Sequence, residues 1–217
     1  MTDVWSQRAD AFRDSPTHRE GPDLDLLVEW CEPGPGVKVL DVATGGGHVA
    51  RRLREHGCTV VTVDAAPGME PDVVAPAEAL PFEDGSFDVV TCRIAAHHFA
   101  DVRRAVAEMT RVSNSLLVVE DNVYRGDHVE DAERLRDPSH VRCYSEDEWK
   151  EMVTDAGFEV EQVHHFPRRQ SFDAWLARVE TTSAAAEQIR SLLADEIDAD
   201  GNVELHSIVL KARRSQR

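Results

Sequence analysis

Two acidic residues and a run of three glycines stand where they could hold a ligand. In the stretch VLDVATGGGHVA, residues 39–50, an apolar segment ends on Asp41 and glycines follow at 45–47. Glycines let a backbone approach a ligand closely, and a helix that begins there presents free N–H groups. Asp64 ends the next apolar segment, nineteen residues after Gly45. This spacing predicts a ligand site between two strands and a helix.

Three classes of ligand compete for such a loop. A nucleoside triphosphate needs lysine followed by serine or threonine after the glycines, but His48 and Val49 stand there, so we set it aside. A dinucleotide stays open, because residues 45–50 satisfy G-x-G-x-x-A and Asp64 stands where an acid binds ribose hydroxyls. S-adenosylmethionine needs the same ribose acid, but its other end carries an ammonium and a sulfonium. Asp41 favours this third ligand, because a carboxylate attracts those cations and repels a pyrophosphate.

Histidines further along the chain are candidates for the reacting end of the site. Methyl transfer from a sulfonium needs a base only where the acceptor must lose a proton; excluding water and aligning the acceptor supply much of the rate. His97 and His98 follow a predicted strand, and neighbours in an extended segment point to opposite sides. We therefore favour His98 as the candidate base, with a structural or merely pocket-lining role as the alternative. We assign His97, His140 and Arg142 to the acceptor pocket, with hydrogen bonding that stabilises the loops as the alternative.

Other polar residues carry weaker signals. The four cysteines lie far apart without a CxxC pair, and His164 and His165 lack a third ligand, so no metal site is predicted. Glu120 and Asp121 end a predicted strand, where we expect a solvated acidic rim. Trp5 and Phe12 are seven residues apart and suit one face of a helix that could fold over the ligand, with simple core packing as the alternative.

The elements that position these residues alternate between strand and helix. Period-2 and continuous apolar runs predict strands at 37–43, 58–65, 87–95, 114–122, 159–166 and 202–212. Helical spacing predicts helices at 48–57, 101–112, 145–158 and 171–197, with Ser145 and Glu148 forming a capping box. This alternation predicts a mostly parallel sheet covered on both faces.

The connection after Asp64 departs from this alternation. Only residues 65–72 separate it from the next apolar pair, and Pro67 and Pro71 both disfavour a helix interior. A parallel crossover usually needs a dozen residues or more. We therefore predict that the crossover helix is missing or shortened and that residues 72–75 form a short edge strand.

Several of these motifs together resemble a known family. The segments VLDVATGGGH, VDAAPGM, AEALPFEDGSFDVVTCRIAAHHFADVRRAV and EMTRV are similar to class I S-adenosylmethionine-dependent methyltransferases of type 11, the ubiquinone/menaquinone methyltransferase-like group. The resemblance covers residues 35–165. It implies a Rossmann-like, doubly wound α/β fold with a seven-stranded, mostly parallel sheet in the order 3-2-1-4-5-7-6 and an antiparallel last strand.

The resemblance also implies roles for individual residues. It places Asp41, Thr44, Gly45 and Gly47 at the methionine end of the cofactor and Asp64 at the ribose diol. Ala65 would lie against the adenine face, and Ala77 and Glu78 would border the adenine edge. Arg93 would belong to the segment beneath the cofactor. Two residues depart from the pattern. Ala43 replaces the usual first glycine, which is tolerable if its backbone angles are ordinary. Pro76 stands where many relatives carry an aspartate that bonds the adenine amino group, so that contact must be lost.

Charge and composition restrict the partners. The chain has 41 acidic and 24 basic residues, a formal net charge of −17, and a field that repels nucleic acid and anionic membranes. It has no apolar run of about 20 residues and its start lacks the pattern of a signal peptide, so we expect a cytoplasmic protein. The excess of acids over few lysines suits a cytosol rich in salt, where charges are screened.

We interpret residues 1–217 as one methyltransferase domain that uses S-adenosylmethionine to methylate a small molecule. An N-terminal helical cap is expected at 1–24, and segments that cover the substrate at 122–145 and 164–185. Two rival interpretations stay open: a protein of this fold that binds the cofactor or a partner without catalysis, and an NAD-dependent oxidoreductase. The sequence predicts neither the acceptor nor the oligomeric state, because variable loops determine the acceptor in such folds.

Overall fold

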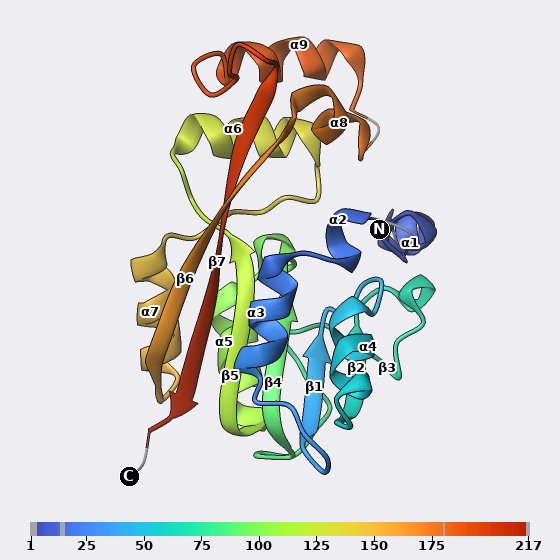
Figure 1. The fold of residues 1–217 in the computed structure, drawn as a ribbon, viewed down its shortest axis with the longest axis vertical. Coiled ribbons are helices and arrows are strands. Elements are labelled where there is room, and N and C mark those ends of the chain that lie inside the picture. The colour runs from blue at the N-terminus through green and yellow to red at the C-terminus, as the bar shows by residue number, and fades with distance from the viewer. Residues whose placement is uncertain (1–3, 14–15, 180, 216–217) are drawn as a thin grey trace.

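A seven-stranded sheet forms the centre of the molecule. The computed structural model describes residues 4–13, 16–179 and 181–215 (Figure 1). The strand order is β3-β2-β1-β4-β5-β7-β6, and β7 runs antiparallel to both of its neighbours, as predicted. The strands are β1 (Lys38–Val42), β2 (Thr59–Asp64), β3 (Val73–Val74), β4 (Phe87–Arg93), β5 (Ser113–Asn122), β6 (Phe158–Ser171) and β7 (Asn202–Arg214).

Helices cover both faces of this sheet. Successive strand residues point to opposite sides, so Leu40 and Val42 of β1 pack in the core beneath α5 and α7, while Val39 packs with α3 and α4. The helices are α1 (Val4–Arg13), α2 (Pro16–Arg19), α3 (Pro22–Trp30), α4 (His48–Glu55), α5 (Val102–Val112), α6 (Asp127–Arg136), α7 (Glu146–Asp155), α8 (Phe172–Ala177) and α9 (Ser183–Leu192), with 3-10 turns η1 (Pro67–Met69) and η2 (Ala96–His98). None of the described helices is both long and apolar enough to cross a bilayer.

Local sequence signals account for several of these boundaries. Ser145 and Glu148 form the predicted capping box at the start of α7, each side chain accepting the other residue's backbone N–H. The predicted loss of a full crossover after β2 is confirmed: the connection contains only the three-residue turn η1, and β3 is two residues long.

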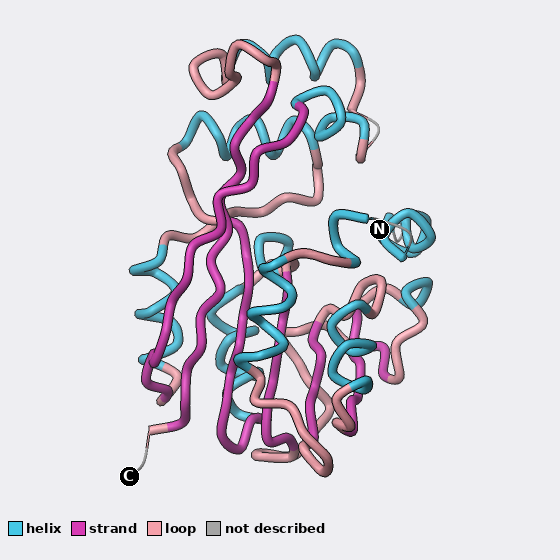
Figure 2. The backbone as a smooth tube through the Cα atoms, viewed as in Figure 1, coloured by secondary structure: helices cyan, strands magenta, loops and turns pink. Residues whose placement is uncertain are grey.

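The segment predicted as one helix at 171–197 forms two. Helix α8 ends at Ala177, and α9 begins after Thr182, whose side chain accepts the Ala185 N–H. With α6, which the sequence did not predict as a helix, they bury a separate core that includes Phe172, Trp175 and Ile189. We call this part, together with the ends of β6 and β7 beyond the other strands, the upper lobe (Figure 2).

Candidate functional site

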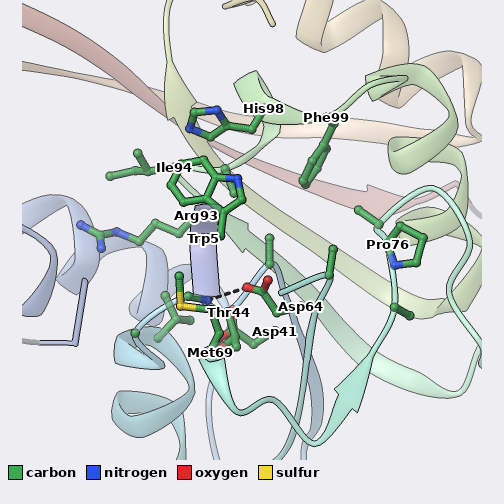
Figure 3. Close-up of a pocket in the computed structure, with 18 of the residues that line it drawn as sticks. Trp5, Asp41, Thr44, Asp64, Met69, Pro76, Arg93, Ile94, His98 and Phe99 are labelled. Atoms are coloured by element: carbon green, nitrogen blue, oxygen red, sulfur yellow. Dashed lines mark hydrogen bonds between the residues drawn. The ribbon is translucent and has the colours of Figure 1, made fainter. Parts of the chain in front are cut away.

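The carboxyl ends of β1, β2 and β4 surround a cavity of about 330 Å³ (Figure 3). In open α/β sheets a ligand binds at this edge, where the strand order reverses, here between β1 and β4. The cavity is lined by Trp5, His18, Asp41, Ala43, Thr44, Gly45, Gly46, His48, Val49, Asp64, Ala65, Met69, Ala75, Pro76, Ala77, Glu78, Arg93, Ile94, Ala95, His98, Phe99 and Ala100.

Most of the site residues expected from sequence meet in this cavity. Those that line it are Asp41, Thr44, Gly45, Asp64, Ala65, Ala77, Glu78, Arg93 and His98. Those that do not are Gly47, His97, His140 and Arg142. Gly47 instead shapes the turn into α4: its φ is +72° and its N–H donates to the Thr44 carbonyl at 2.9 Å.

Asp41 is a buried acid at the base of the cavity. It is 2% exposed, and its Oδ2 accepts the Thr44 hydroxyl at 2.6 Å. Burial and, to a smaller extent, the charge of Asp64 raise the pKa of Asp41, while hydrogen bonds from Thr44 and Ala50 lower it, and the net result is a pKa of about 6. At neutral pH the carboxylate is ionised in a poorly solvated place, so a cationic ligand group would stabilise it.

Asp64 holds the glycine loop in place. Its Oδ2 accepts the Gly45 N–H at 3.0 Å, and its Oδ1 accepts the Ala66 N–H at 2.9 Å. The two bonds fix the carboxylate relative to the backbone that a ligand would contact.

Two non-glycine residues that line the cavity have left-handed backbones. Ala43 has a φ of +53° and Ile94 a φ of +50°. The condition under which alanine is tolerable at position 43, ordinary backbone angles, is therefore not met, because the chain turns sharply after β1 where a glycine would adopt this conformation without strain. A β-branched residue such as Ile94 adopts it rarely, and strained backbones of this kind cluster at ligand sites.

Arg93 connects the sheet to the N-terminal segments. It donates to Glu120 Oε2 at 2.7 Å, to Asp23 Oδ2 at 2.5 Å and to the His18 carbonyl at 3.0 Å. Burial lowers the pKa of Arg93, but the charges of Glu120 and Asp23 outweigh this and raise it overall. Its guanidinium thus organises α2, α3 and β5 around the cavity, a role that the sequence did not show.

The side of the cavity assigned to adenine is mostly apolar. Ala75, Pro76 and Ala77 line it, and Pro76 has no backbone N–H to donate. Glu78 Oε1 accepts the N–H groups of Ala100 at 3.0 Å and Asp101 at 3.3 Å. Glu78 therefore ties this loop to the segment that follows η2.

His98 lies at the opposite end of the cavity from Asp41, beside Trp5 (Figure 3). The two rings meet edge to face, with centroids 4.6 Å apart. His98 Nδ1 is 3.1 Å from the Ser139 carbonyl oxygen, which can only accept, so the proton lies on Nδ1 and Nε2 has a free lone pair. Burial lowers the pKa of His98 well below its usual value and the charge of His97 lowers it further, so the ring is neutral at pH 7.

His97 points into the protein rather than into the cavity. Its Nδ1 lies 2.5 Å from Asp121 Oδ1, and its backbone N–H donates to Asp121 Oδ2 at 2.7 Å. Burial lowers the pKa of His97, but Asp121 more than compensates and the net shift is upward. Glu120 and Asp121 are each 1% exposed, so the prediction of a solvated acidic rim is wrong: Arg93 and His97 neutralise them inside the core.

His140 and Arg142 stabilise loops around α6 and α7. His140 Nε2 lies 3.0 Å from Glu130 Oε2, which also accepts the Cys143 N–H at 3.1 Å. Glu130, His140 and Cys143 are all buried with their ligand-type atoms close together. Burial, reinforced by nearby carboxylates, raises the pKa of the Cys143 thiol, which disfavours the thiolate that a metal requires. The absence of a metal site stays a prediction.

Helix α1 lies over the cavity near η1. Ser6 Oγ accepts the Gly68 N–H at 2.7 Å, and Arg13 donates to the Gly68 carbonyl at 2.6 Å. A Cβ on Gly68 would lie 2.5 Å from the Ser6 Cβ, so the close approach requires glycine. Trp5 lines the cavity from this helix, whereas the side chain of Phe12 lies outside the described part of the structure.

Comparisons with known proteins agree with this geometry. A model of the methyltransferase domain matches residues 40–116. The chain is 34% identical to the uncharacterised methyltransferase YcgJ of Bacillus subtilis over 207 residues, 85% of this chain and 82% of YcgJ. The crystal structure of YcgJ superposes with a TM-score of 0.82 over 90% of this chain and 99% of YcgJ, at 28% identity. A demethylmenaquinone methyltransferase of Renibacterium salmoninarum is 37% identical over 98 residues, 41% of each chain.

The sheet order, the acidic residues at the carboxyl ends of β1 and β2, and the cavity beside them define a Rossmann-like methyltransferase. The chain belongs to the class I S-adenosylmethionine-dependent methyltransferases, in the type 11 family, and is an enzyme of the methyltransferase class.

Proposed function

We propose that the enzyme methylates a small organic molecule and that His98 accepts a proton from it. The observation that carries the proposal is the polarity of the cavity: two carboxylates, Asp41 and Asp64, lie at one end, and a neutral histidine with a free Nε2 lies at the other. We call these the cofactor end, with Asp41, Thr44 and Asp64, and the acceptor end, with Trp5, His18 and His98.

The residues of the cofactor end suit S-adenosylmethionine. The Asp41 carboxylate would attract the ammonium and sulfonium, and Asp64 would accept from the ribose hydroxyls. The N-terminus of α4, at His48 and Val49, offers N–H groups for the methionyl carboxylate. The same Asp41 disfavours the pyrophosphate of NAD, which was the rival ligand.

The acceptor end suits a small molecule. The cavity falls in the lower part of the range of small-ligand pockets, about 300–1,000 Å³, and the cofactor must share it. Trp5, Met69 and Phe99 provide apolar walls that exclude water, and His98 provides the base. The N-terminal cap at 1–24 and the covering segments at 122–145 and 164–185 would complete the enclosure. An acceptor whose reacting atom carries a dissociable proton fits this arrangement best.

Two measurements test the proposal. Calorimetric titration of the protein with S-adenosylmethionine, S-adenosylhomocysteine and NAD should show binding of the first two and none of the third. A screen of phenols, carboxylic acids and amines with S-adenosylmethionine labelled in the methyl group should then find label transferred to a small molecule. Binding of NAD alone, or cofactor binding with transfer to none of these classes, would contradict the proposal.

A further inference from the structure

Three arginines from three different elements gather beside the acceptor end. Arg136 ends α6, Arg168 lies on β6 and Arg178 follows α8. We call them the arginine cluster. Arg168 and Arg178 stand close enough to His18, which lines the cavity, that their charges help to lower its pKa to about 3, after the larger effects of burial and Arg93. In the geometry, the cluster reaches the surroundings of the cavity through Arg168, whose Nη2 lies 3.7 Å from Asp23 Oδ2, because Asp23 also pairs with the cavity-lining Arg93.

Carboxylates neutralise two of the three members. Arg136 is 3.0 Å from Glu133, and Arg168 is 3.7 Å from Asp23, which also binds Arg93. Within the described ranges, no carboxylate lies at ion-pair distance from Arg178, whose side-chain partner is the Gln170 Oε1. Burial and the like charges of Arg136 and Arg168 lower the pKa of Arg178 to about 10. The charge of Glu133 opposes this shift, but the exposed Arg178 has no carboxylate at ion-pair distance in this part of the chain.

A second observation at the same place is a buried hydrogen-bond donor that lacks a hydrogen-bond acceptor. Gln170 and Arg168 are alternate residues of β6 and lie on the same side of the strand. Gln170 accepts from Arg178 through its Oε1, but its Nε2 is buried and has no hydrogen-bond partner among the described residues. A buried hydrogen-bond donor without an acceptor is energetically costly. An anion that accepted hydrogen bonds from both Arg178 and the Gln170 Nε2 would satisfy this donor.

The overall charge makes this arrangement unusual. With a net charge of −17, to which the two carboxylates of the cofactor end contribute, the protein repels anions over most of its surface. A guanidinium offers paired donors that match the geometry of a carboxylate or phosphate. Arg168 and Arg178, together with Arg93, create a local positive field at His18.

We propose that the arginine cluster, with Arg178 at its centre, binds an anionic group of the methyl acceptor. This inference rests on the proposed function of the cavity and narrows its substrate class to small molecules that carry a carboxylate or a phosphate. The anion would lie against the upper lobe, and the atom that receives the methyl group would lie beside His98. Such a two-point fit would align the acceptor with the sulfonium.

The test uses matched probes on the full chain saturated with S-adenosylhomocysteine. Benzoate, phenyl phosphate and neutral benzamide share one ring and differ in charge, and their dissociation constants can be measured by calorimetry. At least one anion is expected to bind about tenfold or more tightly than benzamide, because hydrogen bonds to a charged group discriminate by at least that factor. The preferred anion indicates whether the natural group is a carboxylate or a phosphate.

Variants then locate the binding group. Arg178→Gln should abolish the preference for the anion, and Arg178→Lys should restore part of it. Arg190→Gln is the matched control, because Arg190 is an exposed arginine of the same lobe that pairs with Asp173 at 2.9 Å. Arg168→Gln provides a second variant in case Arg178→Gln is unstable, and circular dichroism checks that each variant is folded.

Two outcomes overturn the inference. One is equal affinity of the unmodified protein for the anions and benzamide. The other is an equal loss of the preference for the anion in Arg178→Gln and Arg190→Gln, which would indicate a general effect of net charge. Failure of the proposed function is distinguished beforehand, because it appears as a lack of heat with S-adenosylhomocysteine in the unmodified protein.

Discussion

The cofactor end and the acceptor end of the cavity differ in how the chain builds them. The polar groups of the cofactor end, Asp41, Thr44 and Asp64, come from two neighbouring strands and the loops that follow them. The acceptor end combines Trp5 of α1, His18 of α2 and His98 of η2, and His98 is fixed by the carbonyl of Ser139. One end is thus local in sequence, and the other depends on contacts between distant segments.

The two ends also differ in charge. The cofactor end is acidic, with the pKa of Asp41 raised to about 6 by burial. The acceptor end contains histidines whose pKa values are lowered by burial and by neighbouring positive charges. This separation suits a reaction in which a cationic methyl donor meets an acceptor that has lost a proton, because each end stabilises the charge of its own ligand. The following variants test each end separately.

The largest effect is expected at the acceptor end. In His98→Gln the free Nε2 is replaced by an amide that cannot take a proton, and kcat should fall by about 10²-fold or more. The affinity for S-adenosylmethionine should stay unchanged. Initial rates of S-adenosylhomocysteine release with the acceptor found in the screen measure the first quantity, and calorimetry measures the second.

The pH profile distinguishes a base from a structural histidine. Because the pKa of His98 lies well below 6.5, the unmodified enzyme should keep a constant rate through neutral pH and lose activity only in acid. His165→Gln serves as the control, since His165 is an exposed histidine of β6 that pairs with Glu146. If His98→Gln retained full kcat, the acceptor would need no base, and His98 would be only part of the wall.

The next effect is expected at the cofactor end. Asp41→Asn should weaken S-adenosylmethionine binding by about tenfold to a hundredfold, because it removes the charge that attracts the ammonium and sulfonium. Asp195→Asn, which removes one exposed acid elsewhere, should change the affinity little. Unchanged affinity in Asp41→Asn would remove the electrostatic basis for this end of the site.

The same substitution, Asp41→Asn, should increase the stability of the folded protein although it weakens cofactor binding. The pKa of Asp41 is higher in the folded than in the unfolded chain, so its contribution to stability is present below about pH 4 and is lost as pH rises through about 6. At pH 7.5 the free energy of unfolding of Asp41→Asn should therefore exceed that of the unmodified protein by up to about 3 kcal/mol. The variant should accordingly unfold at a higher temperature in a thermal melt. For the same reason, binding of S-adenosylmethionine should weaken below pH 6 in the unmodified protein and not in the variant.

The contrast between the ends also explains what the sequence could predict. Asp41 and Asp64 follow apolar strands in a recognisable motif, and Ser145 and Glu148 have the spacing of a capping box, so local patterns located them. The pairing of Arg93 with Asp23 and Glu120 joins residues 70 and 27 positions apart, which no local pattern records. The burial of Glu120 was missed for this reason: its neutralising partner lies on another strand.

Backbone conformation was the second feature that the sequence could not predict. The left-handed angles of Ala43 and Ile94 could not be inferred, because neither residue type favours them. The break between α8 and α9 was hidden by a helical period that continued across it, and only the cap at Thr182 marks it. The arginine cluster could not be predicted either, because it exists only once the upper lobe is folded against β6.

Helix α1 connects the two ends, and Gly68→Ala tests that connection. The added Cβ would lie 2.5 to 2.8 Å from atoms of Ser6, so α1 must shift away from η1 and move Trp5 from His98. The affinity for S-adenosylmethionine should fall by about tenfold, in line with a packing cost of roughly 1–3 kcal/mol. Gly34→Ala is the control, because a Cβ there meets nothing within 4 Å. Equal affinities in the two variants would show that α1 does not contribute to binding.

The smallest effect concerns the strain at the cofactor end. A left-handed alanine costs about 1–2 kcal/mol, and glycine loses about 0.5–1 kcal/mol more entropy on folding, so Ala43→Gly should stabilise the protein by about 0.5–1 kcal/mol. For a chain of this size the melting temperature should rise by roughly 2–3 °C, measured by calorimetry. Ala65→Gly changes the same residue type in the same cavity at a position without a positive φ, so it should destabilise instead. If both variants lost stability, the left-handed turn at Ala43 would carry no strain, and the cofactor end would be as relaxed as an ordinary loop.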